Sequence, residues 1–331
     1  MTRLERMIIQ SAPIAFLRTR SKTLVMPGFQ GLPLYDVAAF FLKQVNKVGL
    51  NERAAAISFN LIMALPAGCL FLFSLIPYFP KSANFQKEIM NLFKDISPNS
   101  DTYKFIDKLI SDLLDQPHVG IFSFGFLALI FYASNAMIGI IRTFDKSIQE
   151  HKKKFFLQRR LRAIRLTFIL IILILISTLA LLIGKEQFIY VLKNIFQMKR
   201  SERLPWWNAS RWVIIVGLLF FGIALIYKFA PSVKKRWNLI SPGSLLATVL
   251  ILITTILFSY WVTHFGSYNK IYGSIGTVLI IMVLMYINSL ILLVGFELNV
   301  SIASLTRQAE ERMLKEEIKL EKEVLHYEKP V

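Results

Sequence analysis

The sequence has one cysteine and four histidines among 331 residues. A single cysteine, Cys69, cannot form an intramolecular disulfide, and no histidine has a second histidine or a cysteine at the spacing of metal ligands. We therefore expect no disulfide framework and no metal site. Cys69 lies within an apolar run, so it gives no information about the redox compartment.

The signatures of common enzymes are also missing from the sequence. It contains no G-x-x-x-x-G-K-[ST] phosphate loop, no H-E-x-x-H zinc helix and no G-x-S-x-G nucleophile turn. We therefore expect no cofactor, and we expect that the protein is not an enzyme.

Acidic residues are scarce: 21 Asp and Glu stand against 39 Lys and Arg, for a net charge of +18. The basic residues lie in clusters between long apolar runs, which is the pattern of a membrane protein and not of a soluble nucleic-acid-binding face. Hydrophobic residues make up 55% of the chain, with 27 phenylalanines, and the mean hydropathy is +0.52. This composition predicts an all-α protein embedded in lipid, with membrane lipids as partners and no specific nucleic acid.

Six segments are long and apolar enough, or nearly so, to cross a membrane as helices. A spanning helix needs about 20 predominantly apolar residues, because the hydrocarbon core is about 30 Å thick. The fourth segment is short, so its ends are uncertain. The six segments are Ala54–Phe79, Val119–Ile141, Leu166–Gly184, Trp212–Tyr227, Ser244–Phe265 and Ile275–Val300.

The distribution of Lys and Arg predicts the orientation of these segments. With the N-terminus inside, 27 of the 39 basic residues lie on the cytoplasmic side and 12 lie outside, as the positive-inside rule requires. An even number of helices then places the C-terminus in the cytoplasm as well. We therefore predict a multi-pass membrane protein. The first twenty residues predict no cleaved leader.

The rest of the chain divides around this bundle. Residues 1–53 form a cytoplasmic segment, in which residues 34–50 predict an amphipathic helix, either on the inner membrane surface or as an ordinary cytoplasmic helix. Within the transmembrane domain, residues 54–300, the stretch 82–118 predicts an external helical hairpin. Residues 301–331 are rich in Glu and Lys and predict a solvated helical tail. A coiled-coil contact in this tail would make the protein a homo-oligomer, and this alternative stays open.

Four polar side chains within the predicted spans are candidates for a binding site. They are Asn60, Asn135, Asn288 and Glu297. Such groups must find a partner inside the bundle or line a wet cavity. One interpretation is a cavity open to the cytoplasm with Glu297 as its acidic group, and the other is polar contacts that only hold the helices together.

Two further features could contribute to such a site. Pro66 falls inside the first span, where it removes a backbone donor and can kink or break the helix. The loop 266–276, GSYNKIYGSIG, could present backbone amides, Lys270 and Tyr268 to an anionic group. The alternative for Pro66 is a kink that only shapes the packing of the helices. The alternative for the loop 266–276 is a plain external turn.

Several stretches resemble one known family. They are AAAISF at 54–59, YKFAP at 227–231, SPGSLLAT at 241–248, FGSYNKIYGSIG at 265–276 and GFELN at 295–299. In this order and spacing they resemble the YihY/BrkB family of bacterial inner-membrane proteins, long labelled ribonuclease BN. Asn60 and the segment IRTFDK at 141–146 depart from the family pattern. The resemblance implies a six-helix, multi-pass protein of the bacterial inner membrane whose activity is unsettled.

Three functions are compatible with these observations. The leading hypothesis is transport or handling of a lipid or another amphiphile through a polar cavity that faces the cytoplasm. The second is a scaffold of the cell envelope that binds other proteins. The third, a ribonuclease, has little support, because no cluster of carboxylates or histidines appears on the predicted inner side.

Overall fold

The computed structural model of the protein describes residues 19–75, 119–148, 156–182, 207–233, 237–264 and 274–327. In these residues the secondary structure is helical, apart from one isolated bridge between Val25 and Pro33. Beyond a short helical turn near the start, the helices are α3 (Leu34–Val48), α4 (Leu50–Leu75), α7 (Val119–Ser147), α8 (Phe156–Leu182), α10 (Trp207–Phe229), α11 (Pro242–His264) and α13 (Ser274–Tyr327). The predicted all-α class is thereby confirmed.

Four of these helices are long and apolar enough to cross a membrane. Their apolar stretches lie within Leu50–Phe71, Ser123–Ser147, Pro242–Trp261 and Val278–Leu320. They correspond to the first, second, fifth and sixth predicted spans. The fourth predicted span matches a shorter apolar stretch, Val213–Phe229. The third falls in α8, which carries four arginines in its first ten residues.

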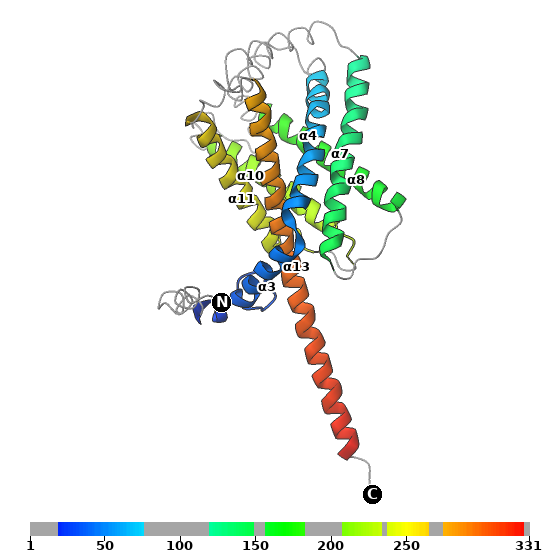
Figure 1. Ribbon diagram of the computed structural model, residues 1–331, viewed down its shortest axis with the longest axis vertical. Helices are drawn as coiled ribbons and strands as arrows, with labels where there is room; N and C mark the ends of the chain where they lie inside the picture. Colours follow the sequence, from blue (N-terminus) through cyan, green and yellow to red (C-terminus); the bar gives the residue numbers. More distant parts are fainter. Residues whose placement is uncertain are drawn as a thin grey trace, which may run out of the picture.

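The helices pack as a bundle in which α13 holds a central place (Figure 1). It contacts α3, α4, α7 and α11, while α8 joins the bundle through α7 and α10. Large apolar side chains with less than 2% exposure form the centre of the core: Ile57, Ile141, Phe144, Leu166, Leu293 and Phe296. The rings of Phe144 and Phe296 are stacked with centroids 3.5 Å apart. This packing ties the end of α7 to the middle of α13.

The last helix, α13, is 54 residues long and has two parts of different character. From Ser289 to Ile302 most of its side chains are buried, whereas the side chains from Ala309 to Leu320 are exposed. Figure 1 shows the second part projecting away from the bundle. The predicted sixth span and the beginning of the predicted tail are therefore one continuous helix.

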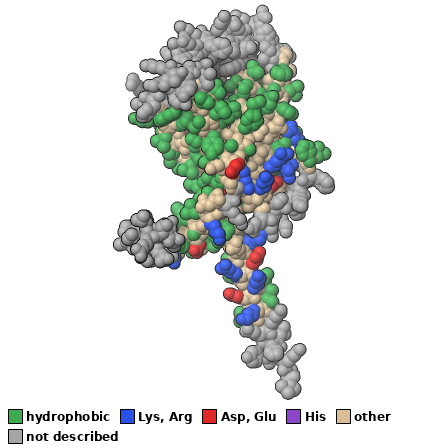
Figure 2. Space-filling view, in the orientation of Figure 1, with side chains coloured by type: hydrophobic (Ala, Val, Ile, Leu, Met, Phe, Trp, Pro, Cys, Tyr) green, Lys and Arg blue, Asp and Glu red, His purple; other side chains and the backbone are tan. Residues whose placement is uncertain are grey.

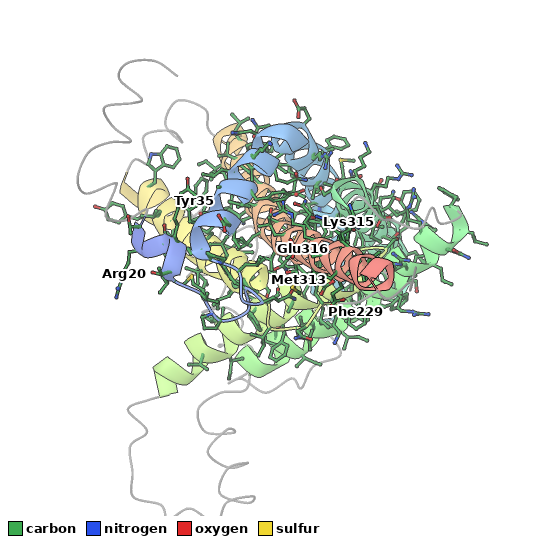
Figure 3. The ribbon with its side chains drawn as sticks, turned by 90° about the horizontal axis from the view of Figure 1, so that it is seen from below. Arg20, Tyr35, Phe229, Met313, Lys315 and Glu316 are labelled. Atoms are coloured by element: carbon green, nitrogen blue, oxygen red, sulfur yellow. The ribbon has the colours of Figure 1, made fainter. Side chains whose placement is uncertain are left out.

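The described part of the N-terminal segment packs against α13 at the end of the bundle from which α13 projects (Figure 1). A turn with positive φ at Gly28 and Gly31 leads into α3. Phe29, Val37 and Ile302 then form a small buried cluster that joins this segment to α13. In the view from below, α3 with Tyr35 lies beside the projecting part of α13 (Figure 3). The α3 helix thus covers one end of the bundle.

The surface of the bundle is largely apolar. Figure 2 shows hydrophobic side chains over most of the visible face, with Lys and Arg low on the bundle and along α13. Large exposed side chains include Phe124, Leu127, Ile256 and Leu257, each more than 60% exposed. A surface of this kind is stable only against lipid or another apolar partner. The segment 82–118 and the loop that holds Tyr268 and Lys270 lie outside the described residues.

Candidate functional site

The buried carboxylate of Glu297 is the centre of a polar cluster between α4, α7 and α13. Glu297 is 1% exposed, and the Ser147 hydroxyl of α7 donates a hydrogen bond to its Oε1. Arg53 of α4 donates from Nη1 to Ser147 Oγ at 3.0 Å, and it also interacts electrostatically with the carboxylate. A negative and a positive group are therefore held together inside the bundle by a shared hydroxyl.

This cluster has two unused hydrogen-bonding groups on the same side of α13. Glu297 Oε2 and Ser301 Oγ are buried, and neither has a hydrogen-bond partner among the described residues. Four residues apart on a helix, the two side chains lie one above the other. The Gln44 side chain of α3 also approaches the carboxylate as a hydrogen-bond donor. A buried polar group without a partner is costly, so these two atoms mark a place where a ligand, water or proton could bind.

The three predicted asparagines have no hydrogen bond to this cluster among the described residues. Asn60 donates from Nδ2 to the carbonyl of Ala56 in its own helix at 2.8 Å. Asn135 Oδ1 accepts a hydrogen bond from Arg160 of α8 at 2.5 Å. The structure therefore gives Asn60 a local helical contact and Asn135 a contact between helices.

Asn288 differs from the other two asparagines because its Oδ1 is buried without a hydrogen-bond partner in the described part of the chain. It precedes Glu297 by nine residues, and nine steps of about 100° place the two side chains on opposite sides of α13. The structure therefore does not bring the four predicted polar residues into one group. At Pro66, α4 continues without a break from Leu50 to Leu75.

A second polar cluster, which the sequence analysis did not single out, joins α7 and α8 to the turn after α10. Asp145 is 5% exposed, and its carboxylate accepts hydrogen bonds from the Ser232 backbone amide at 2.9 Å and from the Ser232 hydroxyl at 3.1 Å. Arg162 of α8 donates to Ser232 Oγ at 2.7 Å and to the carbonyl of Ala230 at 3.1 Å. The cluster fixes the ends of three helices to one another.

A third polar cluster lies at the start of α11. Asn299 of α13 accepts from the Gly243 amide at 2.8 Å and donates to Ser241 Oγ at 2.9 Å. Ser241 and Ser244 bond reciprocally, each side chain accepting from the other residue's backbone amide, which is a capping arrangement for the first turn of α11.

The two helices of this third cluster approach each other closely. A Cβ built on Gly243 would lie 2.1 Å from the carbonyl oxygen of Gly295. Tyr227 donates to the Leu292 carbonyl at 2.6 Å in the same region. The stretches 227–231, 241–248 and 295–299, which carry the family resemblance, thus meet at one place.

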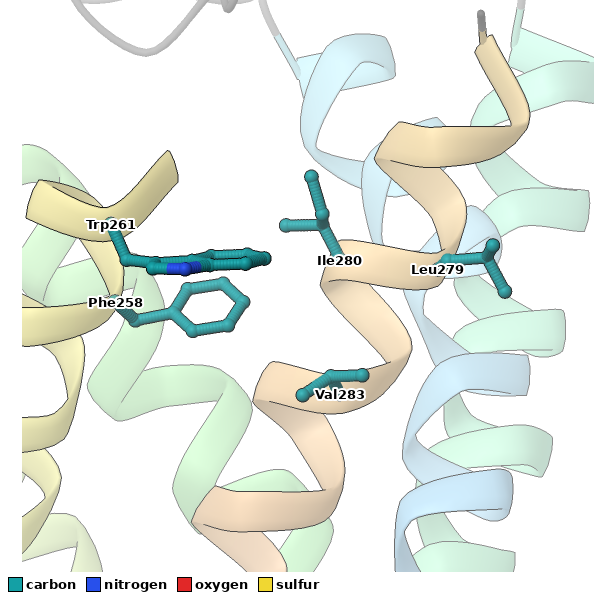
Figure 4. A pocket seen from close by; sticks show the side chains of 5 residues that line it. All are labelled: Phe258, Trp261, Leu279, Ile280 and Val283. Carbon is teal, nitrogen blue, oxygen red and sulfur yellow. The ribbon is translucent and has the colours of Figure 1, made fainter. Parts of the chain in front are cut away.

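A shallow apolar pocket lies toward the other end of the bundle, between α11 and α13 (Figure 4). Its lining consists of Phe258, Trp261, Leu279, Ile280 and Val283. The Phe258 and Trp261 rings lie 5.9 Å apart. The lining offers contact for an acyl chain, and its side chains carry no charge.

Comparison with known proteins identifies the family. The sequence profile of the family described as virulence factor BrkB matches residues 41–320. The chain belongs to this family. All three polar clusters lie within this matched range, which runs from before Gln44 to beyond Asn299.

Several relatives match most of the chain, including proteins of Bacillus subtilis and Haemophilus influenzae. A ribonuclease-like protein, YfkH of Bacillus subtilis, is 27% identical over 263 residues, which are 78% of this chain and 94% of the relative. A UPF0761 membrane protein of Haemophilus influenzae is 22% identical over 285 residues, 85% of this chain and 100% of the relative. No solved structure matches the chain. Together with the apolar helices, these relatives establish a multi-pass membrane protein of the BrkB family.

Proposed function

We propose that the protein binds and translocates a lipid or another amphiphile across the bacterial inner membrane, with the Glu297 cluster as the binding site for the polar head group. The observation that carries this proposal is the buried carboxylate of Glu297, with one oxygen open, on a helix that is apolar enough to cross a membrane. An ionisable group in such a position is costly and is usually retained for function.

The neighbours of Glu297 suggest what the head group would look like. Arg53 provides a positive charge suited to a phosphate, and Oε2 of Glu297 together with Ser301 Oγ can accept hydrogen bonds from a head-group donor. The cargo would then carry a phosphate and a donor group side by side. Because α3 covers the cluster through Gln44, we propose that the site opens to the cytoplasm when α3 moves.

Native mass spectrometry of the gently solubilised protein tests this proposal. We expect wild type to retain a specific lipid or solute, and Glu297→Ala to retain it at least tenfold less, because the acceptor for its donor group is gone. Glu316→Ala, which removes an exposed carboxylate from the projecting part of α13, serves as the control and should behave as wild type. A nonspecific lipid shell in all three proteins would contradict the proposal.

The proposal includes six spanning helices with both ends in the cytoplasm. It is supported by the 27 to 12 distribution of basic residues and by the position of α3 and the projecting part of α13 at the same end of the bundle (Figure 1). In this arrangement α8 and α10 are the third and fourth spans.

A cysteine accessibility experiment tests the orientation. Met313, on the projecting part of α13, is 62% exposed. With Cys69→Ser as background, we expect Met313→Cys to react with a membrane-impermeant maleimide only after spheroplasts are permeabilised. Reaction in intact spheroplasts would place the tail outside and overturn the orientation.

A scaffold function is the second candidate, and the projecting part of α13 favours it. Met313, Leu314, Ile318 and Leu320 are between 44% and 62% exposed there, which would suit a protein partner or a second copy. Crosslinking that recovers a stoichiometric partner, together with no lipid movement in liposomes, would favour this function.

The word ribonuclease in the name of YfkH suggests a third function. We expect that this function is absent and that the purified protein does not cleave RNA.

A further inference from the structure

The first turns of α8 combine four arginines with an exposed apolar stripe. Leu157 is 75% exposed, Leu161 is 61% exposed and Phe168 is 39% exposed. Separated by four and seven residues, the three side chains lie on one side of the helix. Phe156, at the tip of α8, is 68% exposed. The exposed apolar side chains of α8 therefore begin at its N-terminal end, in the same turns as the four arginines.

Two of the four arginines hold α8 in place against the bundle. Arg160 donates to Asn135 of α7, and Arg162 donates to Ser232 and to the Ala230 carbonyl. These bonds come from two different sides of the helix and reach two different elements. They therefore fix its rotation about its own axis, which directs the stripe of Leu157, Leu161 and Phe168 away from the bundle.

The other two arginines are not used in this way. Arg159 has a buried Nε without a hydrogen-bond partner among the described residues, and Arg165 is exposed. No acidic residue occurs between 156 and 182. Arg159 lies on the side of α8 opposite the stripe, whereas Arg165, four residues after Leu161, lies beside it. Positive charge next to the apolar stripe therefore comes from Arg165.

The start of α8 also projects sideways from the bundle, as Figures 1 and 3 show from two directions. In a membrane protein, side chains that point sideways meet lipid. An apolar stripe flanked by arginines is the composition of a helix that lies at the boundary between acyl chains and head groups. We propose that residues 156–168 form an interfacial anchor that binds an anionic phospholipid, with Arg165 contacting the phosphate and Leu157 and Leu161 among the acyl chains.

Charge favours a lipid over a second copy of the chain at this surface. A symmetric contact through the stripe would bring Arg165 of one α8 toward Arg165 of another, and α8 has no carboxylate to balance them. An anionic head group balances them directly. This inference does not depend on Glu297, so it can hold or fail separately from the proposed transport.

Lipid selectivity in mixed bilayers tests the anchor. The full chain is reconstituted in phosphatidylcholine, and the relative association of spin-labelled phosphatidylglycerol and phosphatidylcholine is measured by electron spin resonance. We expect wild type to prefer phosphatidylglycerol, and Arg165→Gln to lower this preference about fivefold, since a basic group near the surface contributes roughly a factor of five. Arg165→Lys should retain most of it.

The control is Arg312→Gln, which removes the same charge from an exposed position on the projecting part of α13. It should leave the preference unchanged. Equal preference in wild type and in Arg165→Gln would overturn the inference, as would an equal loss in the control.

A spin label at position 161 gives an independent measurement that does not need an arginine variant. In a Cys69→Ser/Leu161→Cys protein, we expect the label to be more accessible to oxygen than to a water-soluble nickel complex, as for a site among acyl chains. Greater accessibility to nickel would show a solvated helix. A label protected from both reagents would show a protein contact at this surface, and either result would overturn the anchor.

Discussion

Gly243→Ala is expected to lower the folding stability of the protein by about 3 kcal/mol, or to prevent recovery of folded protein. The added Cβ would lie 2.1 Å from the Gly295 carbonyl oxygen and 2.7 Å from the side chain of Asn299. Because the first obstacle is backbone, it cannot move aside without shifting α11 against α13. The thermal midpoint in detergent, together with the fraction of monodisperse protein, measures the effect.

Gly217→Ala is the matched control. It also replaces a glycine inside an apolar helix, α10, but a Cβ at Gly217 would meet no atom within 4 Å among the described residues. We expect it to be neutral or to add up to about 1 kcal/mol, since alanine favours a helix more than glycine does. If Gly243→Ala were as stable as Gly217→Ala, the close crossing of α11 and α13 would be wrong.

Asp145→Ala is expected to have the second largest effect, a loss of about 3 kcal/mol. The variant leaves the buried amide of Ser232 without its acceptor and removes the negative charge next to the cation of Arg162, with which Asp145 shares the Ser232 hydroxyl. Chemical or thermal unfolding of the solubilised protein measures the loss.

Two further variants test whether the loss of stability comes from this hydrogen-bond network or only from the removal of a negative charge. Asp145→Asn keeps an oxygen that can accept from the Ser232 amide, so we expect a loss about half as large. Glu310→Ala removes an exposed carboxylate on α13 and should leave stability unchanged. An Asp145→Ala protein with the stability of wild type would contradict the assignment of this cluster.

The apolar spans were predictable from the sequence because they depend on composition and length alone. Their ends were less predictable. The first span was expected to begin at Ala54, but α4 begins at Leu50, so Arg53 belongs to the helix and reaches a buried partner. The continuation of α13 beyond Val300 follows from residues that favour helices in water as well as in lipid, and the Glu and Lys pairs of its tail predicted this.

The partners of the polar residues were not predictable in the same way. Glu297 stood out in the sequence because an acidic residue is rare within an apolar run. Ser147 and Ser232 did not stand out, because a serine near a helix end is ordinary. Only the packing of α7 against α8 and α13 shows which serine contacts which charged residue. Asp145 carried a readable signal, a carboxylate within IRTFDK directly after an apolar run, but it lies beyond the predicted end of the second span at Ile141, where a carboxylate is ordinary.

Movement of a phospholipid between the leaflets of proteoliposomes is the measurement that most directly tests the central claim. Fluorescent phospholipid in the outer leaflet is bleached by an impermeant reductant, and the rate at which inner-leaflet lipid becomes bleachable is compared for wild type, Glu297→Ala and Glu316→Ala. The account predicts that wild type and Glu316→Ala move lipid faster than empty liposomes and that Glu297→Ala is at least tenfold slower. A wild-type rate equal to that of empty liposomes, or an unchanged rate in Glu297→Ala, would contradict it.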